Sequence, residues 1–225
     1  MLKDGLNQTD PINTIIMKKI LILIAALAML AGNAYSRNFR FGAEAGFDLS
    51  KPSDTEGGTY PAYHFAINGE YDFISPSKGL YIAAKVQLAD KSWSNKFRMP
   101  AYNNVKEIAH PGYLQIPVLA GYRLPVSDDI SFKIEAGPYA GVGLFGSSKI
   151  NIYNGMAKPY KYKEQDCFGT DGAYRRFDAG IAAGIGISIC GHWDLTLNTA
   201  IQLNSFDPAA DKSNRTFGLS VAYLF

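Results

Sequence analysis

Hydrophobic and polar residues alternate along most of this chain, and the pattern is clearest at its C-terminal end. Every second residue there is large and apolar, namely Phe217, Leu219, Val221, Tyr223 and Phe225, and the residues between them are small or weakly polar. A period of two places the large side chains on one face of a β-strand. An aromatic residue at the end of such a strand is typical of the aromatic girdle of a membrane barrel, although a soluble β-sandwich can end in the same way.

Seven further segments share this period, and the connections between them alternate in length. The segments are 39–49, 62–73, 80–89, 113–124, 131–144, 177–189 and 193–203. The short connections are 74–79, 125–129 and 190–192, and the long ones are 50–61, 90–112, 145–176 and 204–214. Tilted strands of about 10 residues cross a bilayer, and short turns on one side with long loops on the other are typical of outer-membrane barrels. We therefore predict an all-β fold, an eight-stranded antiparallel up-and-down transmembrane β-barrel with both termini on the short-turn side.

The second face of the predicted strands carries charges of both signs. The charged residues on this face are Arg40, Glu44, Asp48, Glu70, Lys85, Arg123, Lys133, Glu135, Asp178 and Asp194. A Lys or Arg that faces lipid at the bilayer midplane costs about 2–4 kcal/mol, so we expect these residues to face the lumen. Because eight strands leave an interior that side chains fill, we predict a plugged lumen with ion pairs. A path for protons or ions is the alternative.

Two prolines, Pro117 and Pro138, lie inside predicted strands. Proline lacks the N–H that a β-ladder needs and is found at edges or bulges, whereas a closed barrel has no edges. We therefore expect bulges or twist irregularities at these two positions.

The first part of the chain has the pattern of a secretory signal peptide. Lys18 and Lys19 follow Met17, an apolar run extends from Ile20 to Leu30, and small residues lead to Ser36. The apolar run is well under the roughly 20 residues that a spanning helix needs. We predict a signal peptide at 17–36, cleaved after Ser36 or alternatively after Ala34, and a barrel domain at 37–225. Residues 1–16 are interpreted as an upstream extension from a misassigned start.

Composition narrows the classes of protein that fit. The net charge of +2 is too small to imply nucleic acid as a partner, and a mean hydropathy of −0.07 argues against a helical membrane bundle. The chain holds 22 Gly, 14 Tyr and 13 Phe, which favours strands and tight turns. Its two cysteines, Cys167 and Cys190, fall at opposite ends of the predicted barrel. They should not form a disulfide, which needs Cα atoms within about 7 Å.

Candidate chemistry is sparse. His64, His110 and His192 fall in a strand, a long loop and a short turn, so we predict no catalytic triad, no metal site and no cofactor. His110 shares its loop with Ser92 and Ser94, but the spacing matches no hydrolase motif. We therefore expect no enzymatic activity.

The connection 145–176 is the largest candidate binding surface. It has six basic and three acidic residues, a net charge of +3, and four tyrosines. The basic residues are Lys149, Lys158, Lys161, Lys163, Arg175 and Arg176, the acidic residues are Glu164, Asp166 and Asp171, and the tyrosines are Tyr153, Tyr160, Tyr162 and Tyr174. This composition favours contact with the phosphates of surface lipopolysaccharide or with a protein partner. A solvated loop in which 148–153 and 158–163 form a hairpin is the alternative.

Several segments, in this order, resemble the PorT-like porin-family outer-membrane β-barrel proteins. They are 113–124 around Pro117, 135–144 around Pro138, the Phe-Asp-Ala-Gly segment at 177–180, and the end at 217–225. The resemblance implies a barrel in the outer membrane of a Gram-negative envelope, inserted by the barrel-assembly machinery through the C-terminal strand. It brings no catalytic residues and does not establish transport.

Two functions remain open for such a barrel. The first is a structural or interaction barrel, whose membrane part is an anchor and whose long loops or periplasmic turns bind a partner. The second is a narrow channel for small solutes or ions. A soluble ligand-binding barrel would place the apolar face inside, and the glycines and charges on the other face speak against it. The expected partners are outer-membrane lipids, lipopolysaccharide and, during insertion, the barrel-assembly machinery.

Overall fold

The computed structural model describes residues 38–53, 58–99, 102–153, 161–169, 174–207 and 212–225. The chain divides into two units, Met1–Arg37 and Asn38–Phe225, and only the second is described here. The predictions for the signal peptide and for the upstream extension lie outside the described residues. Within these residues, no helix is long and apolar enough to cross a membrane.

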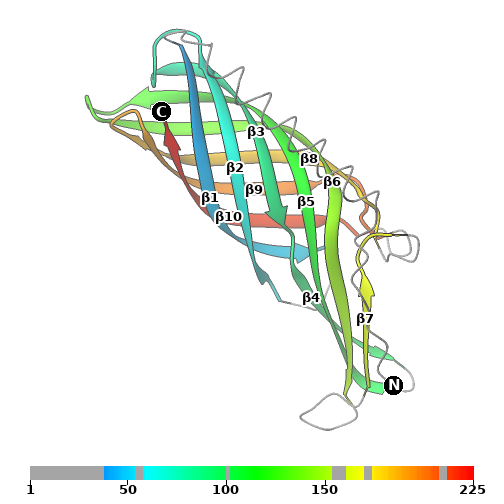
Figure 1. The fold of residues 1–225 in the computed structure, drawn as a ribbon. Helices are drawn as coiled ribbons and strands as arrows, with labels where there is room; N and C mark the ends of the chain where they lie inside the picture. The colour runs from blue at the N-terminus through cyan, green and yellow to red at the C-terminus, as the bar shows by residue number, and fades with distance from the viewer. Residues whose placement is uncertain (1–37, 54–57, 100–101, 154–160, 170–173, 208–211) are drawn as a thin grey trace, which may run out of the picture. The chain divides into compact units, whose positions relative to one another are not determined.

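Ten antiparallel strands make up the described unit, and eight of them close a ring (Figure 1). The strands are β1 (Phe39–Pro52), β2 (Tyr60–Asp72), β3 (Gly79–Asp90), β4 (Trp93–Met99), β5 (Tyr102–Pro125), β6 (Ile130–Tyr153), β7 (Lys161–Asp166), β8 (Phe177–Ile189), β9 (Trp193–Gln202) and β10 (Asn214–Leu224). The ring runs β1-β2-β3-β5-β6-β8-β9-β10, and β10 pairs back onto β1. The predicted eight-stranded antiparallel barrel is thus confirmed.

The apolar face of every ring strand points outward. Side chains such as Phe65, Ile134 and Phe217 are 62%, 52% and 57% exposed, whereas the residues between them are buried or small. On β10, Phe217, Leu219 and Val221 are exposed on this outer face, and Phe225 is exposed beyond the strand's last residue. Exposed apolar side chains over a whole barrel are stable only against hydrocarbon, because water would not solvate so large a surface.

The structure differs from the prediction on the side of the long connections. β5 and β6 extend well beyond 113–124 and 131–144, and they stay paired as far as Asn104 and Tyr153. Two strands that the sequence pattern treated as parts of loops, β4 and β7, pair with their outer edges. The result is a four-stranded sheet, β4-β5-β6-β7, which projects from the ring at the lower right of Figure 1 and is called the outer extension below.

The sequence pattern did not predict the outer extension, because its strands do not face lipid. Polar residues occur on both of its faces, so the apolar period of two that reveals a membrane strand is lost. The alternative of a hairpin within 145–176 was closer, since 147–152 of β6 pairs with 161–166 of β7.

The two prolines border one interruption of the ladder. Between β5 and β6, regular pairs run up to Pro117 and Tyr139 and resume at Ala120 and Ala136, so Pro138 lies in the gap. The pairing of β3 with β5 is also interrupted opposite Pro117. The ladder is therefore interrupted at the two prolines, but the register is the same on both sides of the gap, so no bulge forms there; the register shift between β5 and β6 lies at Gly112/Tyr113 instead. Pro138 stays in register with β8.

Candidate functional site: the lumen and its outer closure

The structure places all ten predicted lumen charges in the interior of the barrel. They are between 0% and 8% exposed: Arg40, Glu44, Asp48, Glu70, Lys85, Arg123, Lys133, Glu135, Asp178 and Asp194. Three further buried groups, Asp72, His64 and Lys91, join them. His64 and Asp72 lie on the inward face of the predicted segment 62–73, and Lys91 continues the inward parity of segment 80–89 two residues beyond its end.

Arg123 is the centre of an ion-pair network near the short turns. Its side chain is fully buried, and its Nη2 lies 2.6 Å from Glu70 Oε2 and 3.0 Å from Asp194 Oδ2. Its Nη1 lies 3.4 Å from Asp72 Oδ1, and the guanidinium packs 4.1 Å from the ring centre of Tyr81. A guanidinium has five N–H donors in a rigid plane, so one residue can satisfy three carboxylates, of which two lie on β2 and one lies on β9.

A second arginine links this network to the turns. Arg40 lies 2.9 Å from Asp72 and 3.0 Å from Glu70, and its Nη1 donates to the carbonyl of Gly191 at 2.7 Å. The hydroxyl of Ser77 donates to the same carbonyl at 3.2 Å. The turn between β2 and β3 therefore contacts the turn between β8 and β9, two connections on opposite sides of the ring, across the short-turn end of the lumen.

A row of alternating charges crosses the middle of the lumen. Lys133 Nζ lies 2.7 Å from Asp194 and 3.3 Å from Glu135, and Lys85 Nζ lies 3.6 Å from Glu135 and 2.7 Å from Glu44. Every charge in the row touches one of opposite sign. Such pairing is needed because an unpaired ion in a low-dielectric interior costs several kcal/mol.

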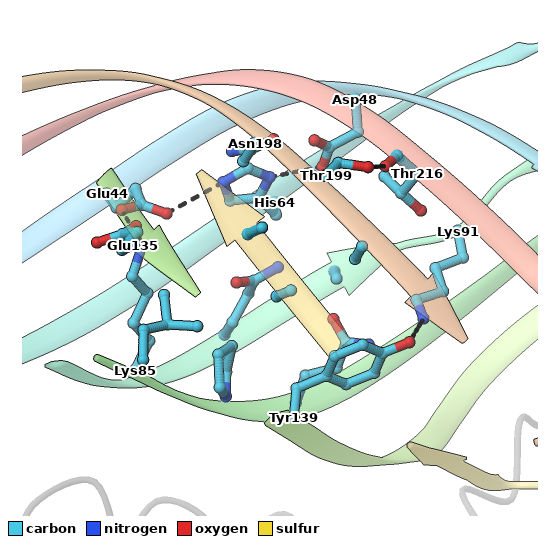
Figure 2. A pocket seen from close by; sticks show the side chains of 18 of the residues that line it. Glu44, Asp48, His64, Lys85, Lys91, Glu135, Tyr139, Asn198, Thr199 and Thr216 are labelled. Atoms are coloured by element: carbon cyan, nitrogen blue, oxygen red, sulfur yellow. Dashed lines mark hydrogen bonds and ion pairs between the residues drawn. The ribbon is translucent and has the colours of Figure 1, made fainter. Parts of the chain in front are cut away.

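His64 lies between two carboxylates of the neighbouring strand. It pairs with Gly46, and a Cβ at Gly46 would meet the imidazole at 2.1 Å, so only glycine leaves room for the ring there. Its Nδ1 lies 2.5 Å from Asp48 and its Nε2 lies 3.3 Å from Glu44, as the dashed lines in Figure 2 indicate. Nδ1 thus makes a hydrogen bond with Asp48, whereas Nε2 has the Glu44 carboxylate nearby but makes no hydrogen bond.

A small chamber remains beside His64. Its volume is about 60 Å³, and its walls include Asp48, Lys85, Gln115 and Asn198 (Figure 2). A cavity of this size with polar walls has room for a few water molecules. The interior is therefore packed with charges at the short-turn end and more open at its middle.

Aromatic side chains gather at the end of the lumen opposite the short turns. Trp93, Ala109, Tyr113, Cys167, Phe168, Tyr174 and Phe206 form one buried group, called the outer aromatic cluster below. Tyr174 lies 5.8 Å from Trp93 and 5.5 Å from Phe206 between ring centres. The cluster combines β4, β5 and residues from two connections, so no periodic pattern in the sequence marked it. Burial raises the pKa of the Cys167 thiol to about 12.

Beneath this cluster, Lys91 crosses the lumen. Its Nζ lies 2.7 Å from Asp178 Oδ2 and 3.2 Å from the hydroxyl of Tyr139. Gln115 also donates to Asp178, at 2.5 Å. The chamber is thus bounded by polar contacts on its outer side as well.

The two cysteines lie at opposite ends of the barrel and are free, as expected. Cys167 is buried in the outer aromatic cluster, and Cys190 is exposed in the short turn between β8 and β9.

One hydroxyl, imidazole and carboxylate do come together, although the sequence spacing had suggested no such group. The Oγ of Ser92 lies 2.6 Å from Asp90 Oδ1 and 2.6 Å from His110 Nδ1. In a hydrolytic triad the imidazole lies between hydroxyl and carboxylate, where it can take the hydroxyl proton. Here the hydroxyl lies in the middle, and Ser92 is fully buried, so the geometry is that of a structural hydrogen-bond bridge. In the described part of the chain, no group of three or more His, Cys, Asp or Glu side chains is placed to hold a metal ion.

The basic residues of 145–176 are partly engaged within the protein. Lys149 lies 3.3 Å from Glu164, and both are well exposed. Arg176 donates to the carbonyl of Gly143 at 2.9 Å and packs 5.7 Å from the ring of Phe168. Lys163 and Arg175 are exposed, whereas Lys158, Asp171, Tyr160 and the side chains of Lys161 and Tyr162 lie outside the described residues.

Comparison with known protein families decides where this barrel resides. The family described as "Outer membrane protein beta-barrel domain" matches residues 25–207, most of the chain. The chain belongs to this family. It is therefore an integral outer-membrane protein of a Gram-negative envelope. Because the short turns of such barrels face the periplasm, we expect the turns there and the outer extension outside the cell.

Solved structures of similar fold have low sequence identity to this chain. Ail, the attachment invasion locus protein of Yersinia pestis, is 11% identical, with a TM-score of 0.40 over 84% of this chain and 99% of Ail. Neisserial surface protein A is 14% identical, with a TM-score of 0.37 over 83% and 97%. The outer membrane enzyme PagL is 11% identical, with a TM-score of 0.41 over 80% and 97%. Because these TM-scores lie below 0.5, no function is transferred from them. Among curated proteins, no sequence matches the chain.

Proposed function

We propose that this protein is a closed interaction barrel, whose membrane part anchors the outer extension for contact with a partner. The observation that carries the proposal is the charge network around Arg123, which fills the lumen near the periplasm with paired groups. A continuous water path would have to pass this network and the outer aromatic cluster. Opening either closure means separating buried ion pairs or aromatic contacts, which costs several kcal/mol.

A narrow channel is the second candidate, and the chamber beside His64 favours it. A polar chamber of about 60 Å³ in mid-lumen is the kind of space that a stepwise path for small ions would use. The two candidates differ in whether the closures open under a membrane potential.

Within the family we propose the PorT-like group as the nearest functional relation. Support comes from the two proline segments, since Pro117 and Pro138 border the same gap in the ladder. Insertion by the barrel-assembly machinery through β10 is part of the proposal, and its exposed residues Phe217, Leu219 and Val221 are available for recognition. We propose no enzymatic activity, because Ser92 is held as a buried bridge between Asp90 and His110.

Outer-membrane lipids and lipopolysaccharide are the proposed surroundings of the outer extension. The exposed cations Lys149, Lys163 and Arg175 favour contact with phosphates, which accept charge-assisted hydrogen bonds. The protein partner is to be sought on the same extension, since it is the largest structured element outside the bilayer.

Single-channel conductance of the refolded mature protein in planar bilayers tests the proposal. We expect no stable conductance, either for the native protein or for a variant in which Lys133→Glu and Glu135→Lys exchange one charge pair. A steady conductance that this exchange alters would show that the lumen is a path, and the channel would replace the anchor. If none is seen, the outer extension is the bait for recovering the partner, with a variant that lacks β7 as the control.

A further inference from the structure

Two cations lie side by side at the seam where the last strand meets the first. Lys51 of β1 and Arg215 of β10 are register partners, and both are exposed on the outer face. The previous pair on the same face of the ladder is Leu49 and Phe217, both exposed and apolar. The cations therefore stand one step beyond the apolar band, at the extracellular boundary of the hydrocarbon.

The backbone holds these two residues in place. Beyond them Pro52 and Asn214 stay in register, and Ser53 donates its N–H to Ser213 O at 2.8 Å. Directly opposed residues of an antiparallel pair have Cβ atoms about 4.5–5.5 Å apart, and like charges at this distance are destabilising. Arg215 has Ile201 as its register partner on the other side.

No acidic partner for either cation occurs among the described residues. Within the described part of the chain their repulsion is thus uncompensated, and an anion that both can reach would relieve it. A phosphate group suits this geometry because its oxygens accept charge-assisted hydrogen bonds from guanidinium and ammonium groups at once.

The opposite boundary of the barrel differs in charge. Its exposed charged residues in the described short turns are Asp128 and Asp129, with Lys78 on another turn. Cations next to the apolar band at the outer leaflet, and acidic groups at the inner one, match a membrane whose outer leaflet carries phosphate on its lipid headgroups.

We propose that Lys51 and Arg215 form a binding site for the phosphate of an outer-leaflet lipid headgroup, with its acyl chains along Leu49 and Phe217. The site deepens the proposed lipid contact and depends on the outer-membrane location, not on whether the lumen is closed. It places the lipid at the seam between β1 and β10, away from the basic connection 145–176 that the sequence had favoured.

Native mass spectrometry of the refolded protein in detergent tests the site, with phosphorylated lipid A and dephosphorylated lipid A as the probes. We expect the native protein to prefer the phosphorylated lipid by about tenfold, the effect of one to two charge-assisted contacts. The double variant K51S/R215S should lose this preference. K51R/R215K should keep it, and K78S, which removes an exposed cation at the other boundary, should leave it unchanged.

Three results would overturn the proposal. One is equal binding of the two lipids by the native protein, and another is an undiminished preference in the correctly folded K51S/R215S variant. The third is binding of inorganic phosphate alone as tightly as the lipid, which would make the ligand a free anion. None of these results would alter the conductance test, so the closed barrel and the lipid site fail separately.

Discussion

Removal of the Arg123 charge tests whether the lumen network stabilises the barrel. In the variant Arg123→Met the apolar side chain keeps much of the volume but leaves three carboxylates with one cation fewer. Each of these carboxylates retains another partner: Arg40 still contacts Glu70 at 3.0 Å and Asp72 at 2.9 Å, and Lys133 still contacts Asp194 at 2.7 Å. Breaking a buried ion pair from one side costs about 3–5 kcal/mol, and the surviving contacts place the expected loss near 3 kcal/mol.

The loss is measured as the free energy of unfolding in urea, with the protein refolded in lipid vesicles and followed by tryptophan fluorescence. Lys78→Met is the control, because it removes an exposed cation outside the lumen network and should change the stability by less than about 0.5 kcal/mol. The double variant R123M/E70Q should recover about 1 kcal/mol or more, because it removes one uncompensated carboxylate.

Two outcomes would refute the reasoning. A loss below about 1 kcal/mol for Arg123→Met would mean that the network is as accessible to water as a surface salt bridge. A double variant less stable than Arg123→Met would mean that the Glu70 carboxylate is not left uncompensated by the loss of Arg123.

Three further predictions follow from contacts elsewhere in the barrel. His64→Leu should destabilise the barrel by about 1–3 kcal/mol in the same urea assay, because the buried Asp48 carboxylate loses its hydrogen-bond partner; an unchanged stability would show that Asp48 does not depend on this contact. Gly137→Ala should cost about 1–3 kcal/mol, since a Cβ there would lie 2.0 Å from the backbone oxygen of Val118, whereas Gly58→Ala, which meets nothing within 4 Å, should be neutral. A thiol-reactive maleimide at neutral pH should label the exposed Cys190 of the folded protein, whereas Cys167, with a pKa of about 12 and no exposure, should react only after unfolding. In intact cells a membrane-impermeant reagent should label neither cysteine, and surface labelling of Cys190 would reverse the assigned orientation.

The sequence alone predicted the ring of eight strands, with its apolar side chains outside and its charged side chains inside. A strand that crosses a bilayer must show one face to hydrocarbon, so its side chains alternate with a period of two. Segment 177–189 was therefore predicted with the bounds that the structure gives it. The same constraint identified the inward position of the ten charges, because a charge such as Lys133 or Glu135 on the lipid face is too costly to keep.

The pairing of those charges was decided by the tertiary structure. Glu70, Arg123 and Asp194 lie on three strands that are distant in the chain. Only the stagger of the closed ring brings the Glu70 and Asp194 carboxylates within 3.0 Å of the Arg123 guanidinium. Periodicity states which face a side chain occupies, but it contains no information about its height relative to strands several positions away.

The outer extension and the outer aromatic cluster also depended on tertiary structure. β7 shows no apolar period, the short alternation of Trp93, Phe97 and Met99 in β4 was treated as part of a loop, and the cluster residues Trp93, Cys167 and Phe206 come from segments with no shared pattern. The sequence by itself thus determined the part of this protein that the membrane constrains, residue by residue. The packing outside the bilayer depends on contacts between residues far apart in the sequence, and these residues become neighbours only when the barrel closes.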